Sequence, residues 1–375
     1  MLKSVLKEAW AHATRRRETA PRPAIANNTN GHQAWLDGLL VRMFQLIHCL
    51  EKDNFDSDRY RSVSSGDFFY AQHASYFAFF LKRVPDFFSS RCLLADEKSK
   101  ALFDQLILFR ILGHMHVRLP VDGLAIRSKM QMAATWKVSD TADTGILGPL
   151  SVFSIPAGDS SIYVKCWTEN AAASFLLDQY YFSRDGVTVA ADLGDYVIDA
   201  GGCFGDTALR FAHVVGADGH VFTFDPIEKH CEIMHDNFAN NPELKPRIST
   251  YQFGLSDHGN DVAPVASAGR IDPGATISDD SFPMRTIDEL VAGGIVARVD
   301  FIKMDVEGSE LAALQGAKQS LMRWKPKLAI SLYHKPEDFV SIPSWIASLD
   351  CGYRFYLDHY SIHHEETVLY ASAVE

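Results

Sequence analysis

Apolar residues in the first part of the chain recur at helical spacing. Between Trp35 and Leu50 they fall three or four positions apart, and the same spacing returns between about Glu97 and Val117. Such positions lie on one face of an α-helix. The most apolar stretch, Phe68 to Leu81, is interrupted by polar residues and is shorter than the ~20 residues of a membrane-spanning helix, so we expect a buried helix there. The sequence therefore predicts a mainly helical N-terminal region over residues 1–147, with an unknown role.

The pattern changes after Gly145, Gly148, Pro149 and Pro156, because Gly and Pro mark breaks in regular structure. Short apolar runs typical of buried strands then alternate with helical spacing. We expect strands at 196–199, 221–224, 249–253, 301–304 and 328–332, helices at 207–215, 228–239, 309–322 and about 342–349, and an edge hairpin of 353–357 with 367–370. This alternation predicts an α/β domain over 148–375 with a Rossmann-like, doubly wound, mostly parallel sheet.

Composition excludes several classes of protein. The 375 residues include 36 Lys and Arg against 47 Asp and Glu, a net charge of −11, whereas a nucleic-acid binder needs a basic surface. The hydrophobic content of 47% is that of a globular protein. The six cysteines form no C-x-x-C pair, which argues against a disulfide framework or a Cys-rich zinc site. Arg15, Arg16 and Arg17 are not followed by an apolar segment with a cleavage site, so we expect no secretory signal and a cytoplasmic protein.

A glycine-rich segment, D-A-G-G-C-F-G-D-T from Asp199 to Thr207, lies between a predicted strand and a predicted helix. Glycines there allow a tight turn and let backbone N–H groups approach a ligand. A dinucleotide fingerprint would need glycine at 203 and 206, where this chain has Cys203 and Asp206. The loop instead suits the amino-acid part of S-adenosylmethionine, and Asp225, at the end of the next strand, suits its ribose. An ordinary strand–helix turn remains the alternative. The expected cofactor contacts here are Asp199, Gly201, Gly205, Thr207 and Asp225.

Two further segments extend this prediction. Ser256 and Asp257 follow the third strand and are candidates to bond the adenine amine, with an ordinary turn as an equal alternative. The second dense motif, D-F-I-K-M-D-V-E-G-S-E from Asp300, places Asp305 and Glu307 at the carboxyl end of the fourth strand, where ligands bind. Lys303 would be catalytic or would form a structural ion pair with Glu307.

Together these motifs resemble the FkbM family of S-adenosylmethionine-dependent methyltransferases. The resemblance covers about residues 175–372 and rests on the glycine loop, F-D-P at 224–226, T-I-D-E-L at 286–290 and the motif from Asp300. It implies O-methylation, commonly of a sugar or polyketide hydroxyl. By position, the resemblance also implies that the cofactor is contacted by Asp199, Gly201, Gly205 and Asp225. The family more often has Glu where this chain has Asp225, which shortens the reach to the ribose by one methylene.

Methyl transfer to an alcohol is an in-line displacement that a base assists. The candidate bases are Asp305 and His334, a histidine at the end of the 328–332 strand whose pKa we expect near neutrality. A surface histidine is the alternative for His334. The predicted catalytic set is Asp305, His334, Lys303 and Glu307.

Histidines and glutamates also gather near the C-terminus, at His359, His363, His364, Glu365 and Glu366. Adjacent pairs on a hairpin point to opposite faces, so we expect a solvated turn and no metal site. The predicted partner is a small-molecule or glycan acceptor, without nucleic acid or a membrane span, and homo-oligomerisation is left open. A nucleotide-dependent oxidoreductase and a non-catalytic scaffold are the competing functions.

Overall fold

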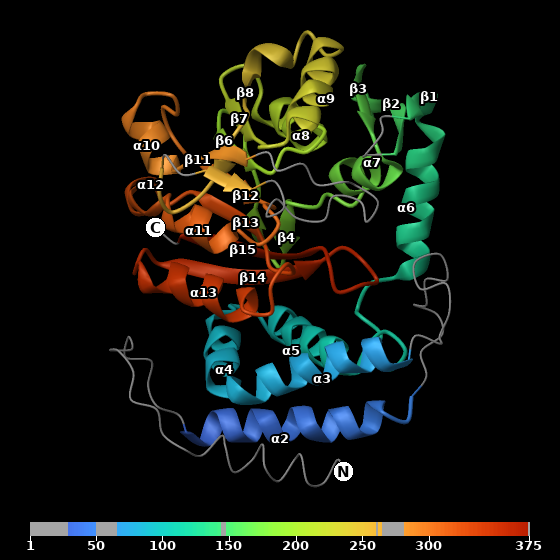
Figure 1. Cartoon of the computed structure of the whole chain (residues 1–375), viewed down its shortest axis with the longest axis vertical. Helices are drawn as coiled ribbons and strands as arrows, with labels where there is room; N and C mark the ends of the chain where they lie inside the picture. Colours follow the sequence, from blue (N-terminus) through green and yellow to red (C-terminus); the bar gives the residue numbers. More distant parts are fainter. Residues whose placement is uncertain (1–28, 50–65, 144–147, 260–261, 265–280, 374–375) are drawn as a thin grey trace. The chain divides into compact units, whose positions relative to one another are not determined.

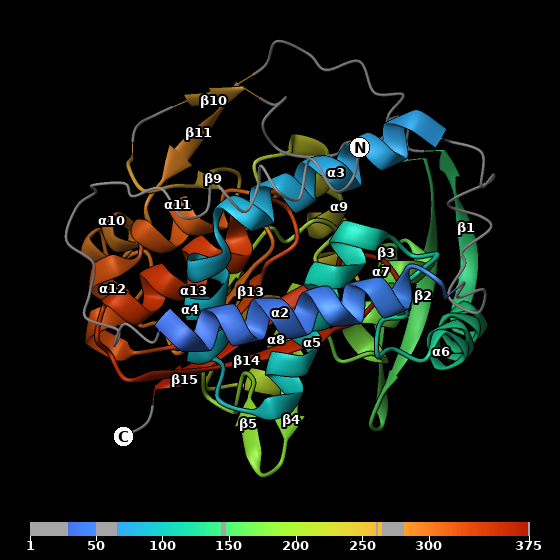
Figure 2. The same cartoon turned by 90° about the horizontal axis from the view of Figure 1, so that it is seen from below.

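The computed structural model describes residues 29–49, 66–143, 148–259, 262–264 and 281–373 (Figures 1 and 2). The chain divides into two compact units. The first, here the helical unit, comprises residues 1–123, 335–350 and 355–367; the second, the sheet unit, comprises 124–334, 351–354 and 368–375. The division at residue 123 differs from the expected boundary at 147, and late segments of the chain return to the helical unit.

Aromatic packing holds the helical unit together. Its helices are α2 (Thr29–Leu46), α3 (Gly66–Lys82), α4 (Val84–Leu93), α5 (Glu97–Leu112) and α13 (Asp338–Ser348). The rings of Phe80 and Phe87 lie 5.2 Å apart, and the contacts continue through Phe103 to Phe339 of α13. The predicted helices are confirmed, although α2 runs from Thr29 to Leu46 rather than from Trp35 to Leu50, and α5 ends at Leu112 rather than near Val117. Over the described ranges, no helix combines the length and the apolar character that crossing a membrane requires.

A seven-stranded sheet organises the second half of the chain, in the order β14-β15-β13-β12-β6-β7-β8. Five of its strands pair in parallel, which confirms the Rossmann-like prediction, and β15 pairs antiparallel with β13. The bounds are β6 (Tyr196–Ala200), β7 (His220–Phe224), β8 (Ile248–Tyr251), β12 (Phe301–Met304), β13 (Lys327–Ser331), β14 (Tyr353–His359) and β15 (Thr367–Ala373). The predicted strand positions agree within two residues, except that β15 ends three residues later than expected.

Helices follow these strands, and those expected from residues 207, 228 and 309 begin within one residue of these positions. They are α8 (Asp206–Val215), α9 (Glu228–Ala239), α11 (Glu310–Gln315) and α12 (Lys318–Trp324), with α10 (Ile287–Ala292) before β12. The single helix expected over 309–322 is wrong, because the chain breaks at Gly316. A side chain there would collide with the carbonyl oxygen of Ser256, and two short helices replace one long helix.

Strands also form where the glycines and prolines predict a break. β1 (Lys137–Asp143), β2 (Pro149–Ala157) and β3 (Ser160–Cys166) make an antiparallel sheet in the order β1-β2-β3. It belongs to the sheet unit, together with α6 (Gly123–Thr135) from Leu124 onward, and with α7 (Thr168–Phe175). The remaining small elements are β4 (Phe182–Arg184), β5 (Val187–Val189), β9 (Gly254–Leu255), β10 (Val262–Pro264), β11 (Ser281–Arg285) and a 3₁₀ turn at Lys245–Arg247.

Two asparagine side chains cover the open edge of β3. Asn241 accepts from the Tyr163 N–H at 2.9 Å and donates to the Tyr163 carbonyl at 2.6 Å. Asn237, on α9, makes the same pair of bonds with Lys165 at 2.7 and 3.0 Å. Asn237 also donates to the carbonyl of Phe204 at 2.8 Å. Each amide group therefore bonds the edge as the backbone of a neighbouring strand would, and Asn237 links that edge to the glycine loop.

Candidate active site

The glycine loop, residues 201–205, connects β6 to α8 at the carboxyl ends of the parallel strands. Gly201 has φ +81°, and a side chain there would collide with the carbonyl oxygen of Asp305. Gly205 has φ +79° and lies so close to Phe238 that a Cβ would be 2.7 Å from its ring. Since a left-handed φ and a close approach both require glycine, these two positions fix the loop against β12 and α9.

Asp225 lies directly after β7 and ties that strand to the loop. Its Oδ2 accepts from the Cys203 N–H at 2.9 Å, and its Oδ1 accepts from the Ile227 N–H at 2.9 Å. The ring of His230 lies 3.1 Å from the same Oδ1. A carboxylate offers about four acceptor positions, so these partners leave one for a ligand hydroxyl.

Asp199 and Lys303 form an ion pair inside the sheet, beneath the loop. Their charged atoms are 3.1 Å apart, and the side chains are 0% and 2% exposed. Asp199 also accepts from the hydroxyls of Thr207 and Thr223, and Lys303 donates to the carbonyls of Ala200 and Gly201. Burial alone would lower the pKa of Lys303, but the negative charges of Asp199 and Asp305 outweigh it and raise the pKa. The partner of Lys303 is thus Asp199 rather than the Glu307 that the sequence suggested.

Asp305, the residue after β12, accepts hydrogen bonds from two tyrosine hydroxyls. Tyr180 donates to its Oδ2 at 2.8 Å, and Tyr333 donates to its two oxygens at 3.0 and 3.1 Å. Tyr180 itself is buried at a left-handed φ of 75°, where its N–H donates to the hydroxyl of Tyr370. Because left-handed backbone is strained for a bulky residue, the surrounding structure must hold this conformation. The Asp305 side chain remains 21% exposed.

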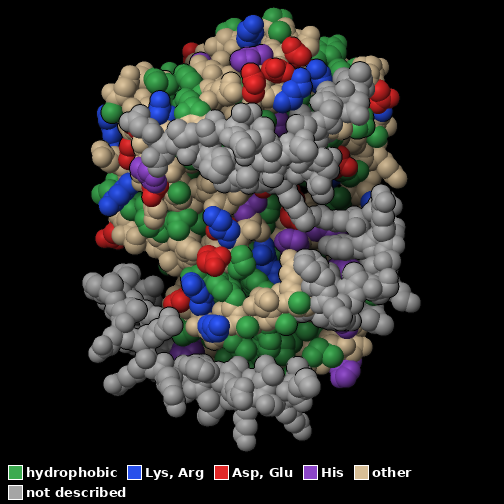
Figure 3. All heavy atoms as spheres, in the orientation of Figure 1, with side chains coloured by type: hydrophobic (Ala, Val, Ile, Leu, Met, Phe, Trp, Pro, Cys, Tyr) green, Lys and Arg blue, Asp and Glu red, His purple; other side chains and the backbone are tan. Residues whose placement is uncertain are grey.

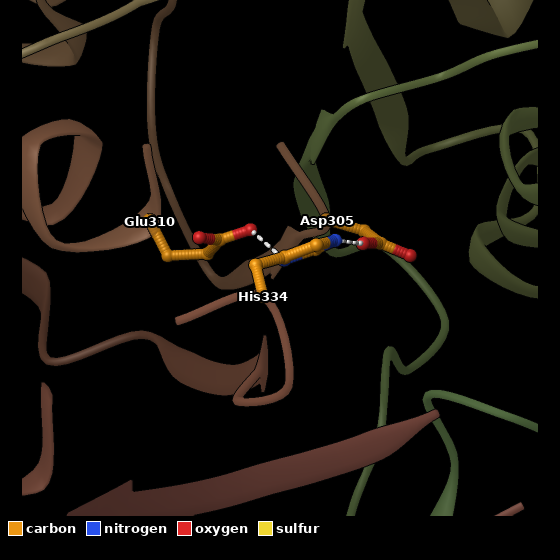
Figure 4. A group of neighbouring side chains, drawn as sticks. All are labelled: Asp305, Glu310 and His334. Atoms are coloured by element: carbon orange, nitrogen blue, oxygen red, sulfur yellow. Dashed lines mark ion pairs between the residues drawn. The ribbon is translucent and has the colours of Figure 1, made fainter. Parts of the chain in front are cut away.

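His334 lies between Asp305 and Glu310 (Figure 4). Its Nδ1 is 2.8 Å from Oε1 of Glu310, and its Nε2 is 3.4 Å from Asp305 and 3.5 Å from Glu307. Burial lowers the pKa of His334, but the ion pair with Glu310 and the charges of Asp305 and Glu307 raise it more, to about 9. The expected pKa near neutrality is therefore corrected upward, and the ring is an imidazolium at neutral pH when nothing else neutralises these acids.

The last two predicted cofactor contacts lie in a different sheet. Ser256 follows β9, which pairs with β11 and not with β8. The Ser256 hydroxyl donates to Asp257 at 3.1 Å, and Asp257 also lies against His258. Their approach to an adenine stays a prediction.

The C-terminal histidines are less exposed than a solvated turn would make them. His359 lies in β14, is 5% exposed and bonds Thr367 through Nδ1 at 2.9 Å. His363, His364, Glu365 and Glu366 are half-buried. Within the described ranges, the His, Cys, Asp or Glu side chains close enough to share an ion are Asp305, Glu310 and His334.

Sequence reasoning missed Tyr180, Tyr333 and Glu310 as parts of this cluster. Tyr333 precedes His334 and Glu310 ends the second motif, so their closeness to predicted residues was a usable signal. The sequence gives no such signal for Tyr180, because this residue lies 125 positions before Asp305, outside the strand–helix alternation.

Comparison with known proteins agrees with this geometry. Residues 199–355 match the family model of the methyltransferase FkbM domain. A hexuronic acid methyltransferase, AglP of Haloferax volcanii, is 28% identical over 138 residues, which cover 35% of this chain and 53% of that protein. The crystal structure of an FkbM methyltransferase from Methylobacillus flagellatus has the same fold, with a TM-score of 0.52 at 19% identity over 78% of this chain and 60% of that one. This chain thus spans about half of the curated relative.

Proposed function

We propose that the protein is an S-adenosylmethionine-dependent O-methyltransferase, because residues 199–355 match the family model of the methyltransferase FkbM domain. The main support for the proposal is the hydrogen bond from the Cys203 N–H to Asp225, which connects the glycine loop to the end of β7. It places backbone N–H groups and a carboxylate at neighbouring strand ends, where a nucleoside with a charged amino-acid tail would need them.

The proposed acceptor is a hydroxyl of a sugar, glycan or secondary metabolite. The relative that methylates hexuronic acid supports a sugar. Asp305, Glu307 and Tyr333 offer carboxylate and phenol groups that suit the hydroxyls of such a molecule. On the face drawn in Figure 3, basic and acidic side chains of the described residues are interspersed.

The chain's own part in the reaction is to orient the acceptor and to take its proton. When bound, the cofactor supplies an electrophilic methyl group on a sulfonium. The acceptor oxygen would gain that methyl as the S–CH₃ bond breaks, the sulfur keeping the electron pair as the thioether of S-adenosylhomocysteine, and the O–H proton would pass to a carboxylate of the protein. Asp305 is the proposed acceptor of this proton, because a protonated His334 and a protonated Lys303 have no lone pair to receive one.

Replacing Asp225 by Ala is expected to weaken the binding of S-adenosylhomocysteine about 10- to 100-fold, since a hydrogen bond to a charged group is worth ~1.5–3 kcal/mol. Isothermal titration calorimetry measures this. The control is Glu232→Ala, an exposed acid on α9 whose removal should leave the affinity unchanged.

The oxidoreductase and scaffold alternatives make different predictions. An oxidoreductase would be stabilised against heat by NAD rather than by S-adenosylhomocysteine. A scaffold would transfer no label from tritiated S-adenosylmethionine to any component of a carbohydrate-containing cell extract. Either result would replace the methyltransferase proposal.

A further inference from the structure

The two oxygens of Asp225, the buried carboxylate at the end of β7, have different surroundings. Oδ1 has two partners: the Ile227 N–H donates to it at 2.9 Å, and Nδ1 of His230 lies 3.1 Å away. Oδ2 has one partner among the described residues, the Cys203 N–H at 2.9 Å. Since each carboxylate oxygen offers about two acceptor positions, Oδ1 is filled and Oδ2 can accept one more hydrogen bond.

The hydrogen bond between His230 and Asp225 has a defined direction. An ionised carboxylate only accepts hydrogen bonds, so the ring nitrogen that faces it must carry the proton. This assigns the proton to Nδ1 of His230, the nitrogen 3.1 Å from Oδ1. His230 therefore takes up, as a donor, the second acceptor position of Oδ1.

Packing holds the His230 ring in this orientation. The side chain lies in the first turn of α9 and is 13% exposed. Its ring meets the ring of Phe204 edge to face, with 5.6 Å between the centroids. Phe204 belongs to the glycine loop, is fully buried and packs on its other contact against Trp167, with centroids 4.9 Å apart. Because core side chains cannot turn without disturbing their neighbours, His230 is a fixed donor to Asp225.

The donor to Oδ2 is held by the backbone. Cys203 has a left-handed φ of 47°, which is unfavourable for a residue other than glycine. Its N–H points at Oδ2 from this conformation. A ligand that bonds Asp225 must therefore share Oδ2 with the glycine loop.

We propose that His230 is a positioning residue that directs the cofactor ribose to Oδ2 of Asp225, so that this carboxylate binds one ribose hydroxyl rather than two. The inference rests on the proposed function, because it takes S-adenosylmethionine as the ligand. With Oδ1 filled, a second hydroxyl finds no acceptor position on Asp225. A purely structural role for His230, joining α9 to the end of β7, would not distinguish one hydroxyl from the other.

The test is calorimetry of the full chain with S-adenosylhomocysteine and with its 2′-deoxy and 3′-deoxy analogues. In the wild type, one analogue should bind within about twofold of S-adenosylhomocysteine and the other at least about tenfold more weakly, because only one hydroxyl bonds the charged oxygen. His230→Phe keeps a ring against Phe204 but removes the donor, so Oδ1 can accept a hydroxyl. The affinities for the two analogues should then agree within about threefold.

Two further variants serve as controls. In His230→Asn, the side-chain amide can donate to Oδ1 from near the position of Nδ1, so this variant should keep the wild-type preference between the analogues. His235→Phe makes the first substitution at an exposed histidine of α9 and should leave all three affinities unchanged.

The outcomes separate this inference from the proposed function. Equal affinities of the wild type for the two analogues, or a wild-type preference in His230→Phe, overturn the inference, and binding of S-adenosylhomocysteine itself then leaves the proposed function standing. A wild type that does not bind S-adenosylhomocysteine rejects both. If circular dichroism shows that His230→Phe does not fold, the wild-type comparison and His230→Asn decide the result.

Discussion

Asp305→Asn is expected to lower the rate of methyl transfer about 10²- to 10⁴-fold, which is the usual contribution of a general base. The amide has the size of the carboxylate but cannot take a proton from the acceptor. The affinity for S-adenosylhomocysteine should stay near that of the wild type, because Asp305 is tied to the end of β6, just before the loop, through its backbone: Asp305 N–H donates to the carbonyl of Ala200 at 3.1 Å. Single-turnover rates with labelled cofactor, beside calorimetry, measure the two effects separately.

Tyr180→Phe and Tyr333→Phe are the matched controls. Each removes one hydroxyl from Asp305 and leaves the carboxylate, so each should slow the reaction less than Asp305→Asn does. If Asp305→Asn retains the wild-type rate, Asp305 is structural and the proton must go elsewhere. If S-adenosylhomocysteine binding is lost as well, the substitution has disturbed the loop.

Lys303→Met is expected to destabilise the protein by about 3–5 kcal/mol, because it leaves Asp199 charged and unpaired in the interior. The methionine fills much the same volume, so lost packing contributes little. Chemical denaturation in urea, followed by circular dichroism, gives the difference in the free energy of unfolding.

Two further variants test whether the unpaired charge of Asp199 causes the loss of stability in Lys303→Met. Adding Asp199→Asn to Lys303→Met should recover part of the stability, because the orphaned charge is gone. Lys327→Met breaks the pairs with Asp192 and Asp195 at a side chain 24% exposed, where solvent screening limits the cost to ~1 kcal/mol. Equal losses in Lys303→Met and the double variant would refute this explanation.

The sheet was predictable because its strands are short, continuous apolar runs followed by helical patterns. The break at Gly316 was not predicted, and the close approach of this glycine to the carbonyl of Ser256 joins residues that are distant in sequence. β2 was missed for a different reason. Pro149 and Pro156 read as breakers, yet the strand pairs with β1 and β3 in spite of them.

The candidate site, too, could be predicted from the sequence only in part. Asp225 and Asp305 could be named as candidates because strand ends in this topology converge on one edge. The partner of Lys303 was not, since the sequence places Glu307 near it while the parallel register puts Asp199 directly opposite on β6. Tyr180 reaches Asp305 from a segment with no periodic pattern of apolar residues. Its left-handed backbone conformation is not predicted by helix or strand propensities.

The amide pairs of Asn237 and Asn241 with β3 bear on how copies of this chain meet one another. An unpaired strand edge is a template on which a second molecule can add a strand, and repeated addition grows fibrils. Here that template is closed by side chains of α9 and of the residues just after it. Along β3, resistance to edge-to-edge addition of strands is therefore only as durable as α9, and heat or denaturant that frays this helix should expose this edge before the central sheet melts.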